Sequence, residues 1–334
     1  MDKTLRIAID LMGSDSLPSL LLEGALQVAK ELPSSYTLVL LVEEGIIDAS
    51  KSVFASSGAL VEILFVQETI HMSEDPLLAV RRKKGSSIAV GLRLLAERKV
   101  DGFVSAGNTG ALLTSALLSL PMLPGVERAA LLAVLPTSIG NVVVLDVGAN
   151  LSVKPQHLLQ FARLGSAYQQ IHYHKKVPKV GLLNVGTESK KGTLGLRKAY
   201  FQLQEHCQGS TQMEFIGNIE GSQVFQGGVD VLVTDGFSGN IFLKTSEGVS
   251  VFILKSIEKA LSESSKDKAG KAIDDLHKTL NYAEYYGAIL AGIDGLVIKV
   301  HGYSTQNAFC NGIKGAFRLA EERFIQRLKT HLDF

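Results

Sequence analysis

The sequence predicts an α/β protein with a mostly parallel but mixed β-sheet, and three observations lead to this fold class. A strand followed by a glycine-containing polar loop and a helix occurs four times, which is typical of a parallel sheet. Two apolar strands, Ala130–Leu135 and Val142–Asp146, are joined by a short link, so we expect that pair to be antiparallel. The chain has 334 residues, 46% of them apolar, and can bury a large core. We expect one α/β unit over 1–334, with two lobes around a cleft.

The clearest copy of the repeated unit is VDVLVTDGFSGNIFLK, at 229–244. Its β-branched strand Val229–Thr234 is predicted to be buried on both faces, and its helix is expected to begin near Ile241. Gly, Asn and Asp are common in any loop, but four such loops at the carboxyl edge of one sheet favour a site. Unpaired amides and the helix dipole at each helix start would stabilise an anion. The other three strands are Gly102–Ser105, Val142–Asp146 and Lys179–Leu183.

The remaining elements follow from apolar periodicity and from helix start and stop residues. Further strands are expected at Leu5–Asp10, Thr37–Val42, Val61–Phe65, Met213–Ile216 and Leu296–Val300, with a loop-like return over Asn281–Ile293. Helices are expected at Ser19–Glu31, Asp48–Ser56, from Asp75-Pro76, Ser86–Glu97, after Gly110, from Pro155 to about Tyr173, from about Thr193, and at Asn307–Leu328.

The alternation of strand and helix breaks at Gly248–Leu280, which is predicted to be an inserted helical hairpin. The residues Ser262–Lys268 would form its polar tip. The apolar stripe of such a hairpin has to be buried against its own second helix, a dimer mate or a membrane surface, and the polar tip disfavours the membrane.

Composition excludes several classes of protein. A formal net charge of +1 and the absence of tryptophan argue against a nucleic-acid binder. The two cysteines, Cys207 and Cys310, have no ligand spacing, which favours a reduced cytosolic protein. The first residues run directly into a strand, so we expect no signal peptide, and no apolar run reaches the roughly 18 residues of a membrane span. Nucleotide fingerprints, H-E-x-x-H and cysteine clusters are missing, so we expect neither a cofactor nor a metal.

The loops supply side chains that suit a phosphate and a developing oxyanion. We expect Lys190 or Lys191, with Lys244, to bind phosphate, and His301 to be an optional proton donor. Asn108, Thr109, Ser238 and Asn240 are candidates for orientation and for oxyanion stabilisation, whereas Asp10, Asp15, Asp146 and Asp235 would position lysines and loops. Asp10 and Asp15 could equally be caps of the following helix. Gly13, Lys84, Asn150 and Ser304 complete the predicted substrate-binding set.

A run of four cations, Arg81, Arg82, Lys83 and Lys84, closes the helix that begins at Asp75-Pro76. Cations gather at helix C-termini because of the helix dipole. Four consecutive cations are more than compensation of the helix dipole requires. They would suit an acidic protein partner or a phosphate.

A serine hydrolase is an alternative, because Ser238, Asp294 and His301 occur in the order Ser, Asp, His. The nucleophile motif G-x-S-x-G is not met, since Gly239 directly follows Ser238 and Asn240 stands in place of the second glycine. His301 could also be a structural turn residue.

Eight collinear segments resemble a known family. They are IAIDLMGSD, RRKKGSSIAVG, FVSAGNTGALL, LDVGAN, KPQHLLQFARLGS, VGLLNVGTESKKG, VTDGFSGNIFLKT and VIKVHGYS, and they extend from Ile7 to about the final helix. In this they resemble the acyl-carrier-protein:phosphate acyltransferase family (PlsX) of bacterial phospholipid synthesis.

The resemblance implies an enzyme that moves a fatty acyl group from acyl-carrier protein to inorganic phosphate. The acyl phosphate would feed a membrane glycerol-3-phosphate acyltransferase on the way to phosphatidic acid. It also implies a three-layer α/β/α fold shared with phosphotransacetylases and with isocitrate and isopropylmalate dehydrogenases. A cytoplasmic homodimer with loose membrane attachment is implied as well. Acyl-carrier proteins are acidic, and Arg81–Lys84 would attract them.

The chemistry of the residues agrees with that reaction. Phosphate is largely dianionic near neutral pH and needs cations rather than a base, while a thiolate is a good leaving group. We therefore expect direct attack of phosphate on the thioester. The sequence departs from the family at Ser14, in the segment NYAEYYGAILAG and at the polar hairpin tip, which puts direct membrane contact in doubt. A coenzyme A-dependent phosphotransacetylase-like enzyme and a membrane-peripheral scaffold without catalysis stay open as alternatives.

Overall fold

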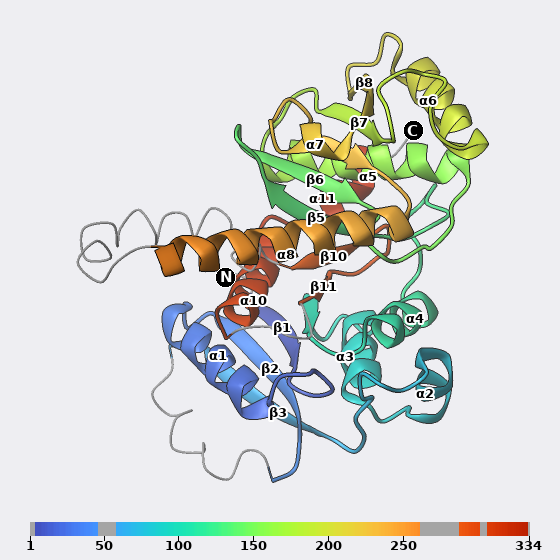
Figure 1. The fold of residues 1–334 in the computed structure, drawn as a ribbon. Coiled ribbons are helices and arrows are strands. Elements are labelled where there is room, and N and C mark those ends of the chain that lie inside the picture. The colour runs from blue at the N-terminus through green and yellow to red at the C-terminus, as the bar shows by residue number, and fades with distance from the viewer. Residues whose placement is uncertain (1–3, 46–57, 261–286, 301–305, 333–334) are drawn as a thin grey trace. The chain divides into compact units, whose positions relative to one another are not determined.

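The computed structural model describes residues 4–45, 58–260, 287–300 and 306–332. The chain divides into two compact units, here called unit 1 (Met1–Ala129 and Tyr286–Phe334) and unit 2 (Ala130–Tyr285) (Figure 1). The predicted helix Asp48–Ser56, the second helix of the hairpin, His301 and Ser304 lie outside the described residues.

Unit 1 contains strands in the order β3-β2-β1-β4-β11-β10. The first five strands in this order run parallel, and β10 is antiparallel to β11. Strand β10 corrects the predicted loop-like return over Asn281–Ile293; its four buried apolar residues are too few to show a period in the sequence. The bounds are β1 Leu5–Asp10, β2 Tyr36–Glu43, β3 Leu60–Val66, β4 Gly102–Ser105, β10 Ala288–Ala291 and β11 Val297–Lys299.

Helices cover both faces of the unit 1 strands. Helix α3 packs on β1, β2 and β4, while α10 packs on β1 and β4 and against α1. Helices α1 and α3 lie on opposite sides of the strands (Figure 1). The single predicted helix Asn307–Leu328 is in fact two helices, because Arg323 takes a left-handed backbone conformation (φ 51°) between them. The bounds are α1 Pro18–Glu31, α2 Pro76–Arg82, α3 Ser87–Ala96, α4 Thr109–Ser119, α10 Gln306–Glu321 and α11 Phe324–Leu332.

Unit 2 contains strands in the order β5-β6-β9-β7-β8. The pair β5·β6 is antiparallel, as predicted, and the strands from β6 to β8 are parallel. The three residues of β9 are fully buried, which confirms that this strand is covered on both faces. The bounds are β5 Ala130–Pro136, β6 Asn141–Leu145, β7 Lys179–Leu183, β8 Glu214–Ile219 and β9 Val231–Val233.

The helices of unit 2 are α5 Pro155–His172, α6 Leu194–Cys207, α7 Gly221–Val224 and α8 Gly236–Ala260. Helix α5 packs on β6, β7 and β9, and α8 contacts β6. Helix α8 corrects two predictions. It begins at Gly236 rather than near Ile241, and it passes without a break through Gly248, where the hairpin was expected to start.

Candidate functional site

In unit 1, buried polar side chains join the carboxyl ends of three neighbouring parallel strands. Asp10 ends β1, Ser105 ends β4 and Lys299 ends β11. The hydroxyl of Ser105 donates to Oδ2 of Asp10 at 2.7 Å, and the backbone N–H of Met12 donates to Oδ1 at 2.9 Å. Nζ of Lys299 donates to the carbonyl of Ala106 at 3.2 Å. The cluster therefore fixes the start of each loop that leaves this edge.

Asp10 is fully buried, and burial raises its pKa to about 6. The hydrogen bonds from Ser105, Met12 and Ser87 and the charge of Lys299 act in the opposite direction, because they stabilise the carboxylate. Asp10 does not cap helix α1, since the N-cap position belongs to Leu17. The cap interpretation of this aspartate is therefore wrong, and its place is in the strand-end cluster.

Asn108 holds the loop that follows β4. Its Oδ1 accepts from the N–H of Ala111 at 3.0 Å and so caps helix α4, in which Thr109 is the first residue. Its Nδ2 donates to the carbonyls of His71 and Met72 at 3.3 and 3.1 Å, and to the carbonyl of Glu74 at 3.3 Å. Asn108 is thus a buried positioning residue that ties its loop to the segment before α2.

Two other predicted residues of unit 1 lie in the loop after β1. Gly13 has a left-handed backbone (φ 69°) and lies so close to the carbonyl oxygen of Ile70 that a Cβ would collide with it. The need for glycine at this position is therefore explained by the turn itself. Asp15 is exposed in the same loop.

The basic run divides into an internal and an external part. Nζ of Lys83 contacts Glu74 and the carbonyl of Thr69, both at 2.7 Å, so this lysine belongs to the local structure. Arg81, Arg82 and Lys84 are exposed at the end of α2.

In unit 2, the loop after β6 is organised around Asp146. This carboxylate is fully buried, which raises its pKa. It accepts hydrogen bonds from the backbone N–H groups of Gly148, Ala149 and Asn150 at 2.7–3.0 Å and from Nδ2 of Asn150 at 2.8 Å. The N–H of Leu131, on β5, donates to it at 3.0 Å. A side chain of the protein therefore occupies the anion-binding amides of this loop.

Three backbone amides at the start of helix α8 also have partners within the protein. The N–H of Ser238 donates to Oδ1 of Asp235 at 2.7 Å, and the N–H of Gly239 donates to its carbonyl at 2.9 Å. The N–H of Gly236 donates to the carbonyl of Asn150 at 2.8 Å. Unpaired amides were expected at the helix start, and at these three positions the expectation is wrong. The amides of 236, 238 and 239 are therefore not available to a bound anion.

The first turn of α8 lies directly on the Asp146 loop. A Cβ at Gly239 would collide with the carbonyl oxygen of Asp146, and one at Gly236 would lie 2.6 Å from the carbonyl oxygen of Asn150. Only glycine permits this contact. The approach places the side chain of Asn240 beside Gly148, with its nearest atoms 3.7–3.9 Å from the position of a Cβ there.

The two candidate lysines lie in a loop held by a buried pair of asparagines. Nδ2 of Asn184, which follows β7, donates to Oδ1 of Asn218 at 3.1 Å and to the carbonyl of Lys191 at 3.2 Å. Asn218, on β8, donates to the carbonyl of Glu188 at 2.8 Å. Lys190 and Lys191 are exposed, and Nζ of Lys191 lies 3.7 Å from the carboxylate of Glu188. The pair thus fixes the backbone and leaves both ammonium groups accessible.

The structure brings together the loops after β6, β9 and β7, because these strands are parallel neighbours. The loop after β6 carries Asp146 and Asn150, and the loop after β7 carries Lys190 and Lys191. Asp235 follows β9, and Ser238 and Asn240 lie in the first turn of α8. Lys244 lies two turns into α8, where its Nζ pairs with Glu247 at 2.7 Å.

Of the residues proposed for a serine hydrolase, Ser238 lies at the start of α8 and Asp294 lies beside strand β11. Asp294 precedes this strand and forms ion pairs with Arg98 and Lys329 at 2.7 and 2.8 Å. His301 lies outside the described residues, whereas the carboxylate of Asp294 already pairs with these two cations.

Four residues with a positioning role were not among the predicted site residues: Ser105, Asn184, Asn218 and Lys299. Ser105 and Lys299 lie at buried ends of apolar strands, which was the available signal. Asn218 was placed in a loop because Gly217 was interpreted as the end of β8. The strand instead continues past a register shift, with Gly217 in a left-handed conformation (φ 98°).

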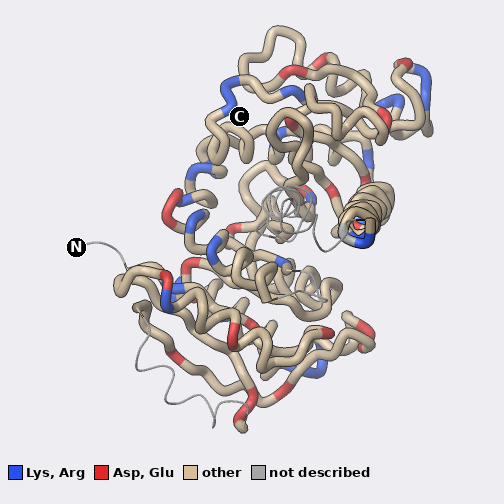
Figure 2. The backbone as a smooth tube through the Cα atoms, turned by 60° about the vertical axis from the view of Figure 1, so that its left-hand side comes forward, with Lys and Arg blue, Asp and Glu red and all other residues tan. Residues whose placement is uncertain are grey.

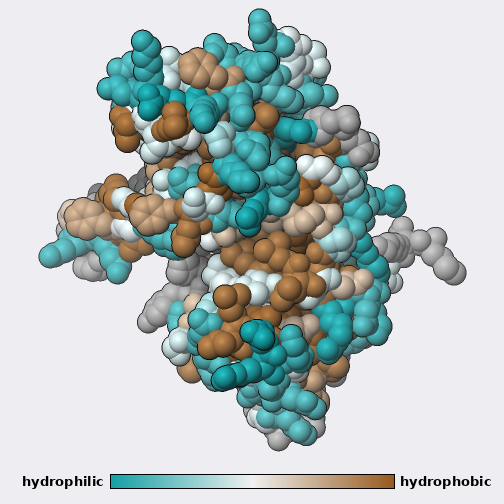
Figure 3. Space-filling view, turned by 90° about the vertical axis from the view of Figure 1, so that its right-hand side faces the viewer, coloured by the Kyte–Doolittle hydropathy of each residue, from teal (hydrophilic) through white to brown (hydrophobic). Residues whose placement is uncertain are grey.

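Charges of both signs are interspersed along both units (Figure 2), which fits the net charge of +1. Figure 3 shows the side on which α2 and α4 lie, and apolar side chains gather on it. The exposed leucines of these helices include Leu77, Leu78, Leu117 and Leu118. Among the described residues, no helix is both long and apolar enough to cross a membrane, and no group of three His, Cys, Asp or Glu could bind a metal ion.

The sequence of this chain is similar to a protein family and to individual members of known function. A family model described as "Fatty acid synthesis protein" matches residues 5–327. The phosphate acyltransferase of Chlamydia pneumoniae is 40% identical over 332 residues, which cover 98% of this chain and 99% of the relative. The phosphate acyltransferase of Brevibacillus brevis is 42% identical over 324 residues, covering 95% and 94%.

Two solved structures show the same fold. A phosphotransacetylase from Streptococcus pyogenes has a TM-score of 0.62 at 16% identity, with 97% of this chain and 95% of that chain covered. A branched-chain phosphotransacylase from Enterococcus faecalis has a TM-score of 0.61 at 13% identity, with 95% and 99% covered. These similarities confirm the predicted phosphotransacetylase-like α/β architecture.

Proposed function

Because the chain belongs to the fatty acid synthesis protein family, in which its matched relatives are phosphate acyltransferases, we propose that it transfers a fatty acyl group from acyl-carrier protein to inorganic phosphate. An oxygen of phosphate attacks the thioester carbon, the C–S bond breaks, and the carrier leaves as a thiolate that takes a proton from water or from His301. The product is acyl phosphate, which a membrane glycerol-3-phosphate acyltransferase would consume. The proposal includes a cytoplasmic homodimer without metal or cofactor.

The lysines of the β7–α6 loop support the binding of phosphate. Lys190 and Lys191 precede a helix N-terminus, and Arg197 and Lys198 lie in its second turn, all of them exposed. Cations near a helix N-terminus are unfavourable for the helix dipole, so the dipole does not explain them. A dianion that binds there would be stabilised by charge-assisted hydrogen bonds.

The first turn of α8 supports the stabilisation of the oxyanion. Its backbone amides at 236, 238 and 239 already have partners, so the donors we propose are the hydroxyl of Ser238 and the amide of Asn240. Loss of one oxyanion donor typically costs about 2.7–4 kcal/mol of transition-state stabilisation. In this proposal Asp146, Asn150 and Asp235 hold the loop and the helix start, and Lys244 contributes charge from farther along α8.

In unit 1, we propose that Asp10 and Asn108 are positioning residues for the loops that carry Gly13, Asp15 and Thr109. Ser304 and Lys84 would contact substrate. Arg81 and Arg82, with the cap residue Lys83 behind them, would attract an acidic carrier protein. The exposed leucines beside them would complete the docking surface.

The observation that carries the proposal is the juxtaposition of two loops in unit 2. The lysine loop follows β7, the Ser238–Asn240 turn follows β9, and these strands are hydrogen-bonded neighbours. A phosphate and an acyl carbon held at these two loops would lie side by side, which is the condition for direct attack.

A coenzyme A-dependent phosphotransacetylase activity is the second candidate, because the solved structures with the same fold include phosphotransacetylases. One assay tests both. The protein is mixed with acyl-carrier-protein thioester or with the matching acyl-coenzyme A, with and without phosphate, and acyl phosphate is measured by mass spectrometry. The proposal expects phosphate-dependent acyl phosphate with a preference for the carrier protein. Preference for coenzyme A would favour the second candidate. No acyl phosphate from either donor would exclude both and favour a non-catalytic scaffold.

A further inference from the structure

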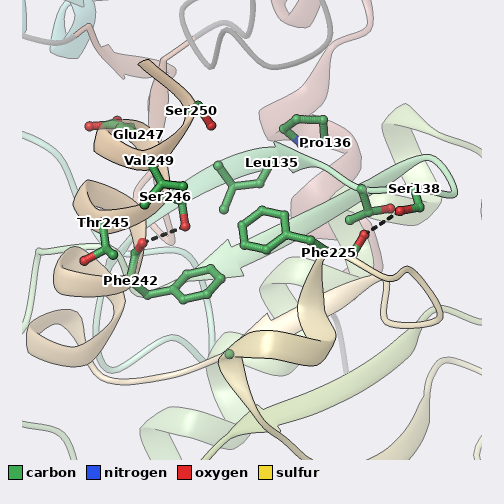
Figure 4. A pocket seen from close by; sticks show the side chains of 12 residues that line it. Leu135, Pro136, Ser138, Phe225, Phe242, Thr245, Ser246, Glu247, Val249 and Ser250 are labelled. Atoms are coloured by element: carbon green, nitrogen blue, oxygen red, sulfur yellow. Dashed lines mark hydrogen bonds between the residues drawn. The ribbon is translucent and has the colours of Figure 1, made fainter. Parts of the chain in front are cut away.

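A cavity of about 580 Å³ lies in unit 2 along one face of helix α8 (Figure 4). Its wall includes Phe242, Thr245, Ser246, Val249 and Ser250. These positions are spaced three and four apart, so they form a single stripe of the helix. The opposite wall is built by the end of β5 and the turn after it, and by α7 with Phe225.

The interior of this cavity is apolar. The rings of Phe225 and Phe242 stack at a centroid distance of 5.6 Å and an angle of 18°, and Leu135 and Pro136 lie across from them (Figure 4). Within the described part of the chain, Glu247 is the one charged residue of the lining, and its carboxylate pairs with Lys244 at 2.7 Å.

Two hydroxyl groups of the lining already have partners. Oγ of Ser246 donates to the carbonyl of Phe242 at 2.8 Å, and Oγ of Ser138 donates to the carbonyl of Phe225 at 2.9 Å (Figure 4). Their hydrogen-bonding needs are met by their own backbone neighbours. With these hydroxyls engaged and two aromatic rings on the wall, an apolar occupant suits the cavity better than ordered water.

The stripe that lines the cavity begins at the candidate site. Ser238 lies four residues before Phe242 and thus one turn earlier on the same face of α8. From Ser238 to Val249 the helix rises by about 16 Å. A ligand whose reacting carbon lies at Ser238 could therefore extend a long unbranched tail along this stripe into the cavity.

We propose that this cavity binds the hydrocarbon chain of the fatty acyl substrate, an inference that rests on the proposed function. The volume lies within the range of about 300–1,000 Å³ that is usual for small-ligand sites. Chain binding would also cover the exposed parts of Val249 and Phe225, which are 50% and 36% accessible. Each methylene group buried in the cavity makes the binding free energy more favourable, so the cavity would determine the preference for acyl-chain length.

The test narrows the cavity at Ser246 and compares donors of different chain length. Ser246→Phe places a ring in the space beside Phe242. Ser256→Phe is the matched control, because Ser256 lies on the same helix outside the lining and its hydroxyl makes the same bond, to the carbonyl of Phe252 at 2.7 Å. For each protein, kcat/KM is measured with palmitoyl- and butyryl-acyl-carrier protein. Ser250→Phe is a second narrowing variant, and circular dichroism verifies folding.

The proposal expects the ratio of palmitoyl to butyryl kcat/KM to fall by roughly tenfold or more in Ser246→Phe or Ser250→Phe. Ser256→Phe should keep the wild-type ratio. An unchanged ratio in the folded narrowing variants would overturn the proposal. An equal loss of kcat/KM with both donors would overturn it as well. A change in oligomeric state without a change in the ratio would also overturn it, because a second copy of the chain would then occupy the cavity. If the wild type makes no acyl phosphate from either donor, the proposed function itself fails.

Discussion

The backbone N–H of Ser238 donates a 2.7 Å hydrogen bond to Oδ1 of Asp235, so a carboxylate closes the start of helix α8. The same turn contacts the loop of Asp146 through Gly236 and Gly239. The helix start is therefore held from two sides. Ser238 and Asn240 depend on both contacts for their position.

Replacement of Asp235 by alanine removes the cap of α8. We expect the free energy of unfolding to fall by about 0.5–2 kcal/mol. We also expect a loss of kcat, because the first turn carries Ser238 and Asn240. Asp235→Asn keeps an acceptor oxygen and is the matched control. Urea unfolding and steady-state kinetics measure the two effects, and equal activity in the alanine variant and the wild type would contradict the positioning role.

Alanine substitutions at two glycines of α8 should have opposite effects on stability. Gly239→Ala would force a Cβ against the carbonyl oxygen of Asp146 and should destabilise the protein by about 1–3 kcal/mol. Gly248→Ala meets no atom within 4 Å and should stabilise it by about 0.5–1 kcal/mol, because alanine favours a helix. Thermal or urea unfolding measures both. The close contact would be refuted by a Gly239→Ala protein as stable as the wild type.

Removal of the loop lysines should weaken phosphate binding. The ion pair of Lys191 with Glu188 is long and about half exposed on both sides, so its loss should hardly affect folding. We expect the KM for phosphate to rise by about 10- to 100-fold in Lys190→Ala or Lys191→Ala, the value of a charge-assisted hydrogen bond. Lys176→Ala, an exposed lysine before the other end of β7, is the control. A normal KM for phosphate in both loop variants would contradict the assignment of these lysines to phosphate binding.

The buried carboxyl of Asp10 should make stability depend on pH. Its pKa is raised to about 6 from an ordinary 3.8, so between these values the folded state binds a proton that the unfolded state does not. The stabilisation is complete below about pH 3.8 and is lost as the pH rises through about 6, by about 3 kcal/mol in all. In Asp10→Asn this decrease should be missing, while the raised pKa of Asp146 acts in both proteins. Urea unfolding from pH 4 to 7 compares them, and parallel curves would contradict the prediction.

The sequence predicted the strands best where a buried apolar run ends at turn residues. The bounds of β1, β4 and β7 agree with prediction to the residue. The start of α8 could not be predicted in this way, because Gly236 and Gly239 look like loop residues. They are glycines for a tertiary reason, the close approach to the Asp146 loop.

The residue types of the candidate site were predictable, but their hydrogen-bonding state was not. Four polar loops at strand ends indicated an anion site. The sequence cannot show that Asp146 folds back onto the amides at 148–150, or that Asn108 uses its amide to hold the chain at 71–74. Such bonds depend on the fold of segments that are distant in sequence or on local chain reversal.

Thiol release in the absence of phosphate distinguishes direct attack of phosphate on the thioester from a covalent acyl-enzyme. Enzyme at a concentration comparable to that of acyl-carrier-protein thioester is mixed in a rapid-quench experiment, and free carrier thiol is measured. With direct attack we expect no burst of thiol without phosphate, and stoichiometric thiol and acyl phosphate once phosphate is added. One equivalent of thiol released per enzyme without phosphate, with the acyl group bound covalently to Ser238 or another residue, would contradict it.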